Sequence, residues 1–83
     1  MEVELTPEAL EDFRALPRTI QKRMESVLRR LEAWPAVSGG KALSGPLAGW
    51  YRIRTGDYRV RFRVERSRIT VDKIGHRKDV YEN

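Results

Sequence analysis

Apolar residues recur along this chain with two different periods. Between residues 6 and 34 they are spaced three and four apart, as in helices that bury one face. Thr6 and Pro7 fit an N-cap and a first helical position, while Pro17 and Pro35 interrupt the pattern. We therefore predict two antiparallel helices joined by a tight turn at Pro17. Their apolar stripes are Leu10, Phe13 and Leu16, and then Ile20, Met24, Val27, Leu28, Leu31 and Trp34.

From residue 51 onward the apolar period is two, which is typical of strands. Segments 51–54, 58–64 and 69–72 alternate in this way and are separated by turns at 55–57 and 65–67, with Gly75 ending the last strand. Val3 and Leu5 predict a further short strand, and the Gly/Pro/Ser-rich segment 35–49 reads as a loop. The predicted fold is α+β: a two-helix hairpin on one face of a small antiparallel sheet, in the order strand, helix, helix, strand, strand, strand. We expect one domain over residues 1–83.

The alternation also predicts what each face of the sheet carries. The apolar face must meet the helices, which gives an expected core of Leu10, Phe13, Met24, Val27, Leu31, Ile53, Val60, Phe62 and Ile69. The opposite face then collects Arg52, Arg54, Arg59, Arg61 and Arg63, and we expect no run of acidic residues there to neutralise them. Trp34 and Trp50 are interpreted as core or core-edge residues, although an exposed Trp50 could stack on a base.

Charge and composition narrow the possible functions. Residues 50–83 carry ten basic and five acidic residues, whereas residues 1–49 carry seven of each, so the net charge of +5 comes from the second part. A basic surface of this kind favours a polyanionic partner. The chain has no cysteine and one histidine, which argues against disulfides, thiolate chemistry and a zinc site. We expect no metal or cofactor, and no membrane span because no apolar run is long enough. We expect a cytoplasmic protein, because residues 1–10 are acidic and unlike a signal peptide.

An ordered set of short motifs connects these observations. Leu43-Ser44-Gly45 is followed by Gly49-Trp50-Tyr51-Arg52-Ile53-Arg54, by Gly56-Asp57-Tyr58-Arg59-Val60-Arg61-Phe62, and by Ile74-Gly75-His76-Arg77-Lys78-Asp79-Val80-Tyr81. Together with the two-helix first half, this order resembles the RelE branch of the RelE/ParE toxin superfamily. The resemblance implies a toxin that cleaves mRNA in the ribosomal A site without a metal ion and is neutralised by a cognate antitoxin. The implied partners are therefore the antitoxin, the ribosome and mRNA.

The same resemblance assigns roles to individual residues. The family's working positions fall on Arg52, Arg54, Arg59, Arg77 and Tyr81. Some relatives, including the best-known branch, have lysines where this chain has Arg52 and Arg54. Arginine is a poor base, so these two residues are expected to bind and orient RNA. Arg61 and Arg63 are expected to contact the RNA backbone or acidic antitoxin residues.

The chemistry needs an acid and a base as well as positive charge. RNA carries its own nucleophile, since a deprotonated 2′-OH can attack the adjacent phosphate, and Arg59 and Arg77 can stabilise the resulting phosphorane. Histidine is the side chain type whose unperturbed pKa lies nearest to neutral pH, so His76 could act as either acid or base. Tyr81 is the leading candidate for the base, because neighbouring arginines favour a phenolate.

Two other functions remain compatible with the sequence. One is a ParE-like module on the same fold that inhibits gyrase without nuclease chemistry. The other is an inactive homologue that only binds its partner. The segment Gly75-His76-Arg77 followed by Val80-Tyr81 favours the RelE branch, whereas the absence of the two lysines keeps the alternatives open.

Overall fold

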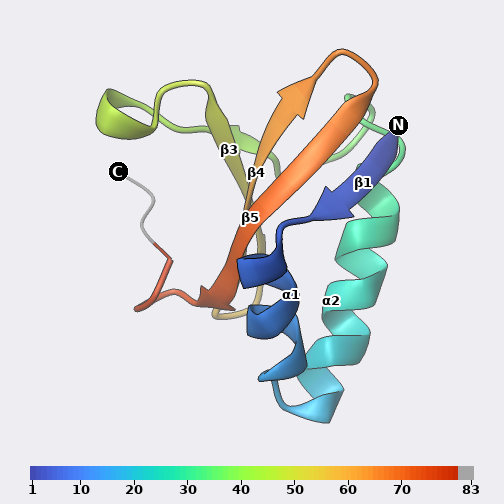
Figure 1. The fold of residues 1–83 in the computed structure, drawn as a ribbon, viewed down its shortest axis with the longest axis vertical. Coiled ribbons are helices and arrows are strands. Elements are labelled where there is room, and N and C mark those ends of the chain that lie inside the picture. The colour runs from blue at the N-terminus through green and yellow to red at the C-terminus, as the bar shows by residue number, and fades with distance from the viewer. Residues whose placement is uncertain (81–83) are drawn as a thin grey trace.

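The computed structural model of this chain describes residues 1–80 and shows two helices packed on a five-stranded sheet (Figure 1). In chain order the elements are β1 (Glu2–Leu5), α1 (Pro7–Arg14), α2 (Arg18–Leu31), β2 (Lys41–Ala42), the 3-10 helix η1 (Gly45–Leu47), β3 (Trp50–Thr55), β4 (Tyr58–Glu65) and β5 (Arg68–His76). The predicted order is confirmed. The segment expected to be a loop adds β2 and η1, and β5 continues through Gly75 rather than ending there.

The sheet is mixed, with strand order β1-β5-β4-β3-β2. The predicted antiparallel pairing holds from β2 to β5, where short turns join β3, β4 and β5. β1 is the exception, because it pairs with β5 in parallel. After β1 the chain crosses over the sheet through both helices, and such a crossover is the connection that lets strands run parallel. Within residues 1–80, no helix is long and apolar enough to span a membrane.

Both helix starts follow the sequence signals. The Thr6 hydroxyl accepts a hydrogen bond from the Ala9 N–H at 3.1 Å, and Pro7 occupies the first helical turn. The Gln21 side-chain amide donates to the carbonyls of Phe13 and Arg14, which closes the turn between the helices. α2 ends at Leu31, three residues before the predicted end at Trp34, and residues 32–35 form turns that return Trp34 to the core.

The core lies between the helices and one face of the sheet. Met24, Val27, Leu31, Ile53, Val60, Phe62 and Ile69 are buried as predicted, and Phe13 is partly buried against them. The prediction that Leu10 belongs to the core is wrong, because its exposed fraction is 38% and Ala9 is buried in its place. α1 is only eight residues long and packs on β5, so a small side chain at Ala9 allows close approach at the centre of that contact. Trp34, Tyr51 and Phe62 form an aromatic cluster with centroid separations of 5.0, 5.3 and 5.7 Å.

Strand β5 contains an irregularity that shapes both of its faces. Arg61 pairs with Lys73 but Phe62 pairs with Val71, so Asp72 is an extra residue on β5. Without this bulge the strict alternation after Val71 would turn Lys73 toward the core. With it, Ile74 is the buried residue, and the adjacent Asp72 and Lys73 escape burial.

The buried position of Leu31 generates a stability prediction. Leu31→Ala should lower the free energy of unfolding by about 2–5 kcal/mol, because it leaves a cavity among fully buried neighbours. Leu10→Ala is the matched control and should cost less than about 1 kcal/mol, because that side chain is exposed. Urea unfolding measures both, and equal losses would contradict the assignment of the core.

Candidate nucleic-acid interface

The face of the sheet turned away from the helices is lined with basic side chains. Ile53, Val60 and Phe62 belong to the core, so the residues that alternate with them lie on the opposite face. In the strand register Arg52 stands opposite Arg61, and Arg54 stands opposite Arg59. The predicted grouping on one face is therefore confirmed. We call this surface the basic face, and its residues from β2 to β4 are Lys41, Arg52, Arg54, Arg59, Arg61 and Arg63.

Arg61 is held by an acidic partner that the sequence analysis did not assign. Its Nε and Nη2 atoms donate to the two carboxylate oxygens of Asp72 at 3.0 and 2.8 Å. These hydrogen bonds raise the pKa of Arg61 above its ordinary value. The expectation that no acidic residue would neutralise these arginines is wrong at this position. The bulge provides the reason, because it accommodates Asp72 and Lys73 together outside the core.

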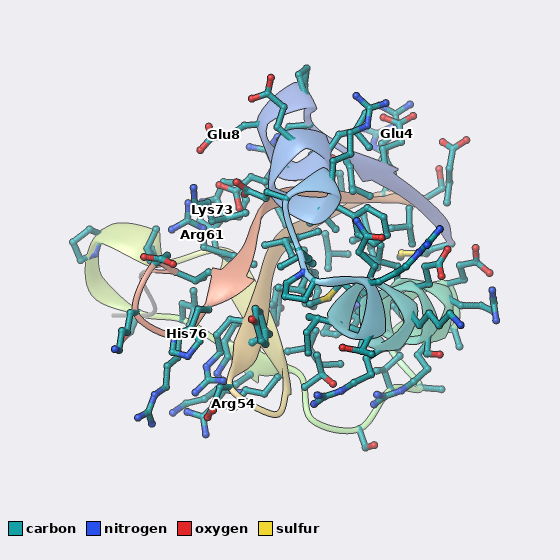
Figure 2. The ribbon with its side chains drawn as sticks, turned by 90° about the horizontal axis from the view of Figure 1, so that it is seen from below. Glu4, Glu8, Arg54, Arg61, Lys73 and His76 are labelled. Carbon is teal, nitrogen blue, oxygen red and sulfur yellow. The ribbon has the colours of Figure 1, made fainter. Side chains whose placement is uncertain are left out.

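A second group of charges ties the bulge to α1. Lys73 Nζ lies 3.2 Å from a Glu8 carboxylate oxygen and 3.7 Å from one of Asp12. The hydrogen bond to Glu8 is the main cause of a raised pKa at Lys73. Asp12 also accepts a hydrogen bond from the Ile74 N–H at 3.1 Å. Figure 2 shows Glu8, Lys73 and Arg61 gathered at this junction, so α1 holds the end of the bulge in place.

Arg52 and Arg59 are buried, each with an exposed fraction of 7%. Arg52 Nη1 lies 3.5 Å from the Gly39 carbonyl oxygen. Arg59 Nη1 donates to the carbonyls of Gly56 and Tyr58 at 3.1 and 3.2 Å, which directs it back toward the β3–β4 turn. These contacts restrict the orientation of both guanidinium groups before any ligand arrives, which is an advantage for charge stabilisation.

The segment after β5 folds back at the same end of the sheet. The Arg77 N–H donates to the Asp57 carbonyl at 2.7 Å, which fastens this segment to the β3–β4 turn. Val80 is buried, and it lies next to Gly75, the residue opposite Arg59. The Arg77 side chain is exposed. Tyr81, the expected base, lies outside the described residues.

His76 lies on the other side of the sheet from the basic face. It stands opposite Tyr58 and makes an edge-to-face contact with that ring at 5.5 Å. Both residues help to line a pocket of about 580 Å³ beside Leu16 and Pro17. His76 Nδ1 accepts a hydrogen bond from the Lys78 N–H at 3.2 Å. The structure thus brings the five predicted strand arginines together and does not bring His76 to them.

Comparison with known proteins decides the family. Residues 3–81 match the family described as the ParE toxin of the type II toxin–antitoxin system parDE. The chain belongs to this ParE toxin family. The predicted membership of the RelE/ParE superfamily is thereby confirmed. No curated protein matches the chain by sequence.

Solved structures similar to this ParE-family toxin carry several names. The RelBE2 toxin–antitoxin complex from Mycobacterium tuberculosis is 26% identical with a TM-score of 0.81, and the match covers 94% of this chain and 92% of that one. The YoeB/ParE toxin from Agrobacterium tumefaciens is 23% identical with a TM-score of 0.77, covering 92% and 98%. The isolated Escherichia coli RelE toxin is 20% identical with a TM-score of 0.75, covering 90% and 82%. The last two likenesses show a common fold.

Two further residues of this ParE-family protein lie beside the strand arginines, where the sequence analysis did not place them. Trp50, which was interpreted as a core or core-edge residue or, if exposed, as a residue that could stack on a base, stands opposite Arg63 on the basic face. The alternation could have predicted this position, because Trp50 is two residues before Arg52 on the same strand and their side chains therefore lie on the same face. Asp72 follows Val71, which faces the core, so the alternation could have placed Asp72 on the opposite face as well. The charged Lys73 after it was a signal that strict alternation does not continue, because it would place a lysine in the core. Among residues 1–80, no three His, Cys, Asp or Glu side chains form a group that could hold a metal ion.

The pair between Arg61 and Asp72 can be tested by a double-mutant cycle. Asp72→Ala should lower the free energy of unfolding by about 1.5–3 kcal/mol, because both side chains are largely shielded from water and the bonds are charge-assisted. Arg61→Ala should then add little in the double variant. As a control, Arg68→Ala removes contacts to Glu2 and Glu4 that are about half exposed, and it should cost less than about 1 kcal/mol. Chemical denaturation gives all values, and additive losses at residues 61 and 72 would contradict the pairing.

Proposed function

We propose that this chain is the toxin of a type II toxin–antitoxin pair and cleaves translated mRNA on the ribosome, using the 2′-hydroxyl of the RNA as the nucleophile. The observation that carries the proposal is the two pairs of opposed arginines, Arg52 with Arg61 and Arg54 with Arg59, on a single sheet face. These four guanidinium groups belong to two neighbouring strands, and one of them is held by Asp72. A polyanion that lies across this face can contact several of them at once, and RNA is such a polyanion.

The proposed chemistry divides the arginines by their burial. Arg59 is buried and restrained by two carbonyls, so it is suited to stabilise the charge that develops on the phosphorane. Arg77 is exposed at the same end of the sheet and is assigned to the scissile phosphate with it. Arg54 and Arg63 are exposed and bind the RNA backbone, while Arg52 and Arg61 orient it.

Proton transfer is assigned to groups at the end of the chain. We assign the general base to Tyr81 on the sequence motif that contains it, because positive charge close to a phenol favours its phenolate. His76 is the alternative base, or the acid that protonates the leaving 5′-oxygen. Because His76 lies on the other side of the sheet from Arg59, this alternative requires the RNA to pass around the end of β5.

A second candidate function, inhibition of gyrase, is suggested by the match to the ParE toxin family. The family model is that of ParE toxins, so a module that inhibits gyrase on this same fold is the alternative. It predicts trapped DNA breaks in a gyrase assay and no cleavage of mRNA. An inactive homologue predicts neither result. Mapping cleavage on purified translating ribosomes, beside a gyrase cleavage assay, separates these outcomes.

The role of Tyr81 predicts a defect in rate. Tyr81→Phe should slow single-turnover cleavage on ribosomes by at least about 100-fold, because loss of one acid–base group typically costs that much. Ribosome binding should remain nearly unchanged. Arg54→Ala is the matched contrast: it should weaken binding and lower the salt dependence of the affinity, because it removes one phosphate contact. Full activity in both Tyr81→Phe and His76→Ala would assign proton transfer to another group.

The proposed antitoxin predicts a gain in stability. We expect an acidic or amphipathic segment of the cognate antitoxin to cover Arg52, Arg59 or Arg77. Because it binds only the folded toxin, it should stabilise the fold by about 2.7 kcal/mol at a free concentration one hundred times its Kd. Thermal unfolding with the product of the adjacent reading frame tests this. An unchanged Tm at saturating partner would reject that product as the antitoxin.

A further inference from the structure

Trp50 is an aromatic side chain on the charged side of the sheet. The aromatic cluster of Trp34, Tyr51 and Phe62 lies on the opposite side, in the core. Trp50 alternates with Tyr51 along β3 and stands opposite Arg63 on β4, so it projects among the arginines instead. It is half-buried and is not part of the core cluster. The core therefore does not account for a large apolar ring at this position.

The guanidinium groups of two arginines lie against the Trp50 ring. The Cζ atoms of Arg61 and Arg63 are 5.7 and 5.1 Å from the ring centroid, within the range of cation–π attraction. The two arginines differ in how firmly they are held. Arg61 is fixed by two hydrogen bonds to Asp72, and its side chain is 17% exposed. Arg63 is 48% exposed and meets Glu65 only at 3.6 Å, across an exposed ion pair that contributes little.

We propose that Trp50 is a stacking site for an unpaired RNA base on the basic face. Every base has a flat π face that can stack on an indole ring, and flanking arginines can bind the phosphates on either side. The fixed Arg61 holds the ring from one direction. The more exposed Arg63 gives way to the base and turns its guanidinium to the adjacent phosphate. Binding thus exchanges one planar partner of Trp50 for another and gains a phosphate contact.

This inference rests on the proposed function and adds a contribution to RNA affinity that depends on the nucleobases. Arginines that contact phosphates hold an RNA strand without regard to its bases. A stacking site makes affinity depend on whether a base is present at one position of the strand. If Trp50 only covers the aliphatic parts of Arg61 and Arg63, the bases of the bound strand contribute nothing through it. The two roles therefore differ in a measurable way.

The experiment compares two probes of equal length and charge. One is a short unpaired 2′-O-methyl oligoribonucleotide, which lacks the 2′-hydroxyl nucleophile and cannot be cleaved. The other is the same backbone without bases. Trp50→Leu should weaken binding of the first by about 5- to 100-fold and leave binding of the second unchanged. Trp50→Phe, which keeps a smaller ring, should retain a measurable part of the difference between the probes. Equal effects of Trp50→Leu on both probes would overturn the proposal.

Fluorescence supplies a second readout that does not depend on affinity. The chain has two tryptophans, so Trp34→Phe leaves Trp50 as the sole tryptophan, and its emission is followed with excitation that is selective for tryptophan. The base-bearing probe should quench this emission and the abasic probe should not. In Trp50→Leu, where Trp34 is the sole emitter, neither probe should quench. If Trp34→Phe fails to fold, the difference between the wild-type and Trp50→Leu signals gives the same information. Quenching that persists in Trp50→Leu would overturn the stacking site.

The same proteins separate this inference from the proposed nuclease. Cleavage of mRNA on ribosomes with no base-dependent binding through Trp50 leaves the nuclease standing and removes the stacking site. Base-dependent binding that requires Trp50, in a protein that cuts no mRNA, keeps the stacking site and rejects the nuclease. Each outcome decides one of the two questions independently.

Discussion

Burial of one apolar sheet face under two helices is the constraint on which the rest of this structure depends. Ile53, Val60 and Phe62 can be removed from water only on the side that α1 and α2 cover. Because neighbouring side chains in a strand point in opposite directions, that choice sends every intervening arginine to the other side. The basic face is therefore a direct consequence of core formation.

Concentrating arginines in this way has an electrostatic cost that the fold offsets locally. The bulge in β5 keeps both Asp72 and Lys73 out of the core, so that one pairs with Arg61 and the other with Glu8 of α1. Arg59 reaches instead for carbonyl groups of the β3–β4 turn. Such contacts fix the side chains in position before a ligand binds. A preorganised cationic surface loses less side-chain entropy when an anionic strand arrives.

The arrangement relates the fold to the proposed activity. Proteins with 20–26% identity share this fold, and they include toxins named RelE, YoeB and ParE. A fold by itself does not specify a reaction. In this chain, the proposed function depends on what the sheet face carries: the buried Arg52 and Arg59, the exposed Arg54 and Arg63, and an indole ring close to Arg61 and Arg63.

The sequence by itself determined the elements, their order, most of the core and the grouping of five arginines, because these follow from local periodicity and from capping residues such as Thr6. Only the tertiary structure decided the parallel pairing of β1, the exposure of Leu10, the bulge at Asp72 and the separation of His76 from the arginines. Each of these depends on which distant segment a residue meets. Lys73, for example, pairs with Glu8 and Asp12 of α1, and no pattern within β5 encodes the position of that helix.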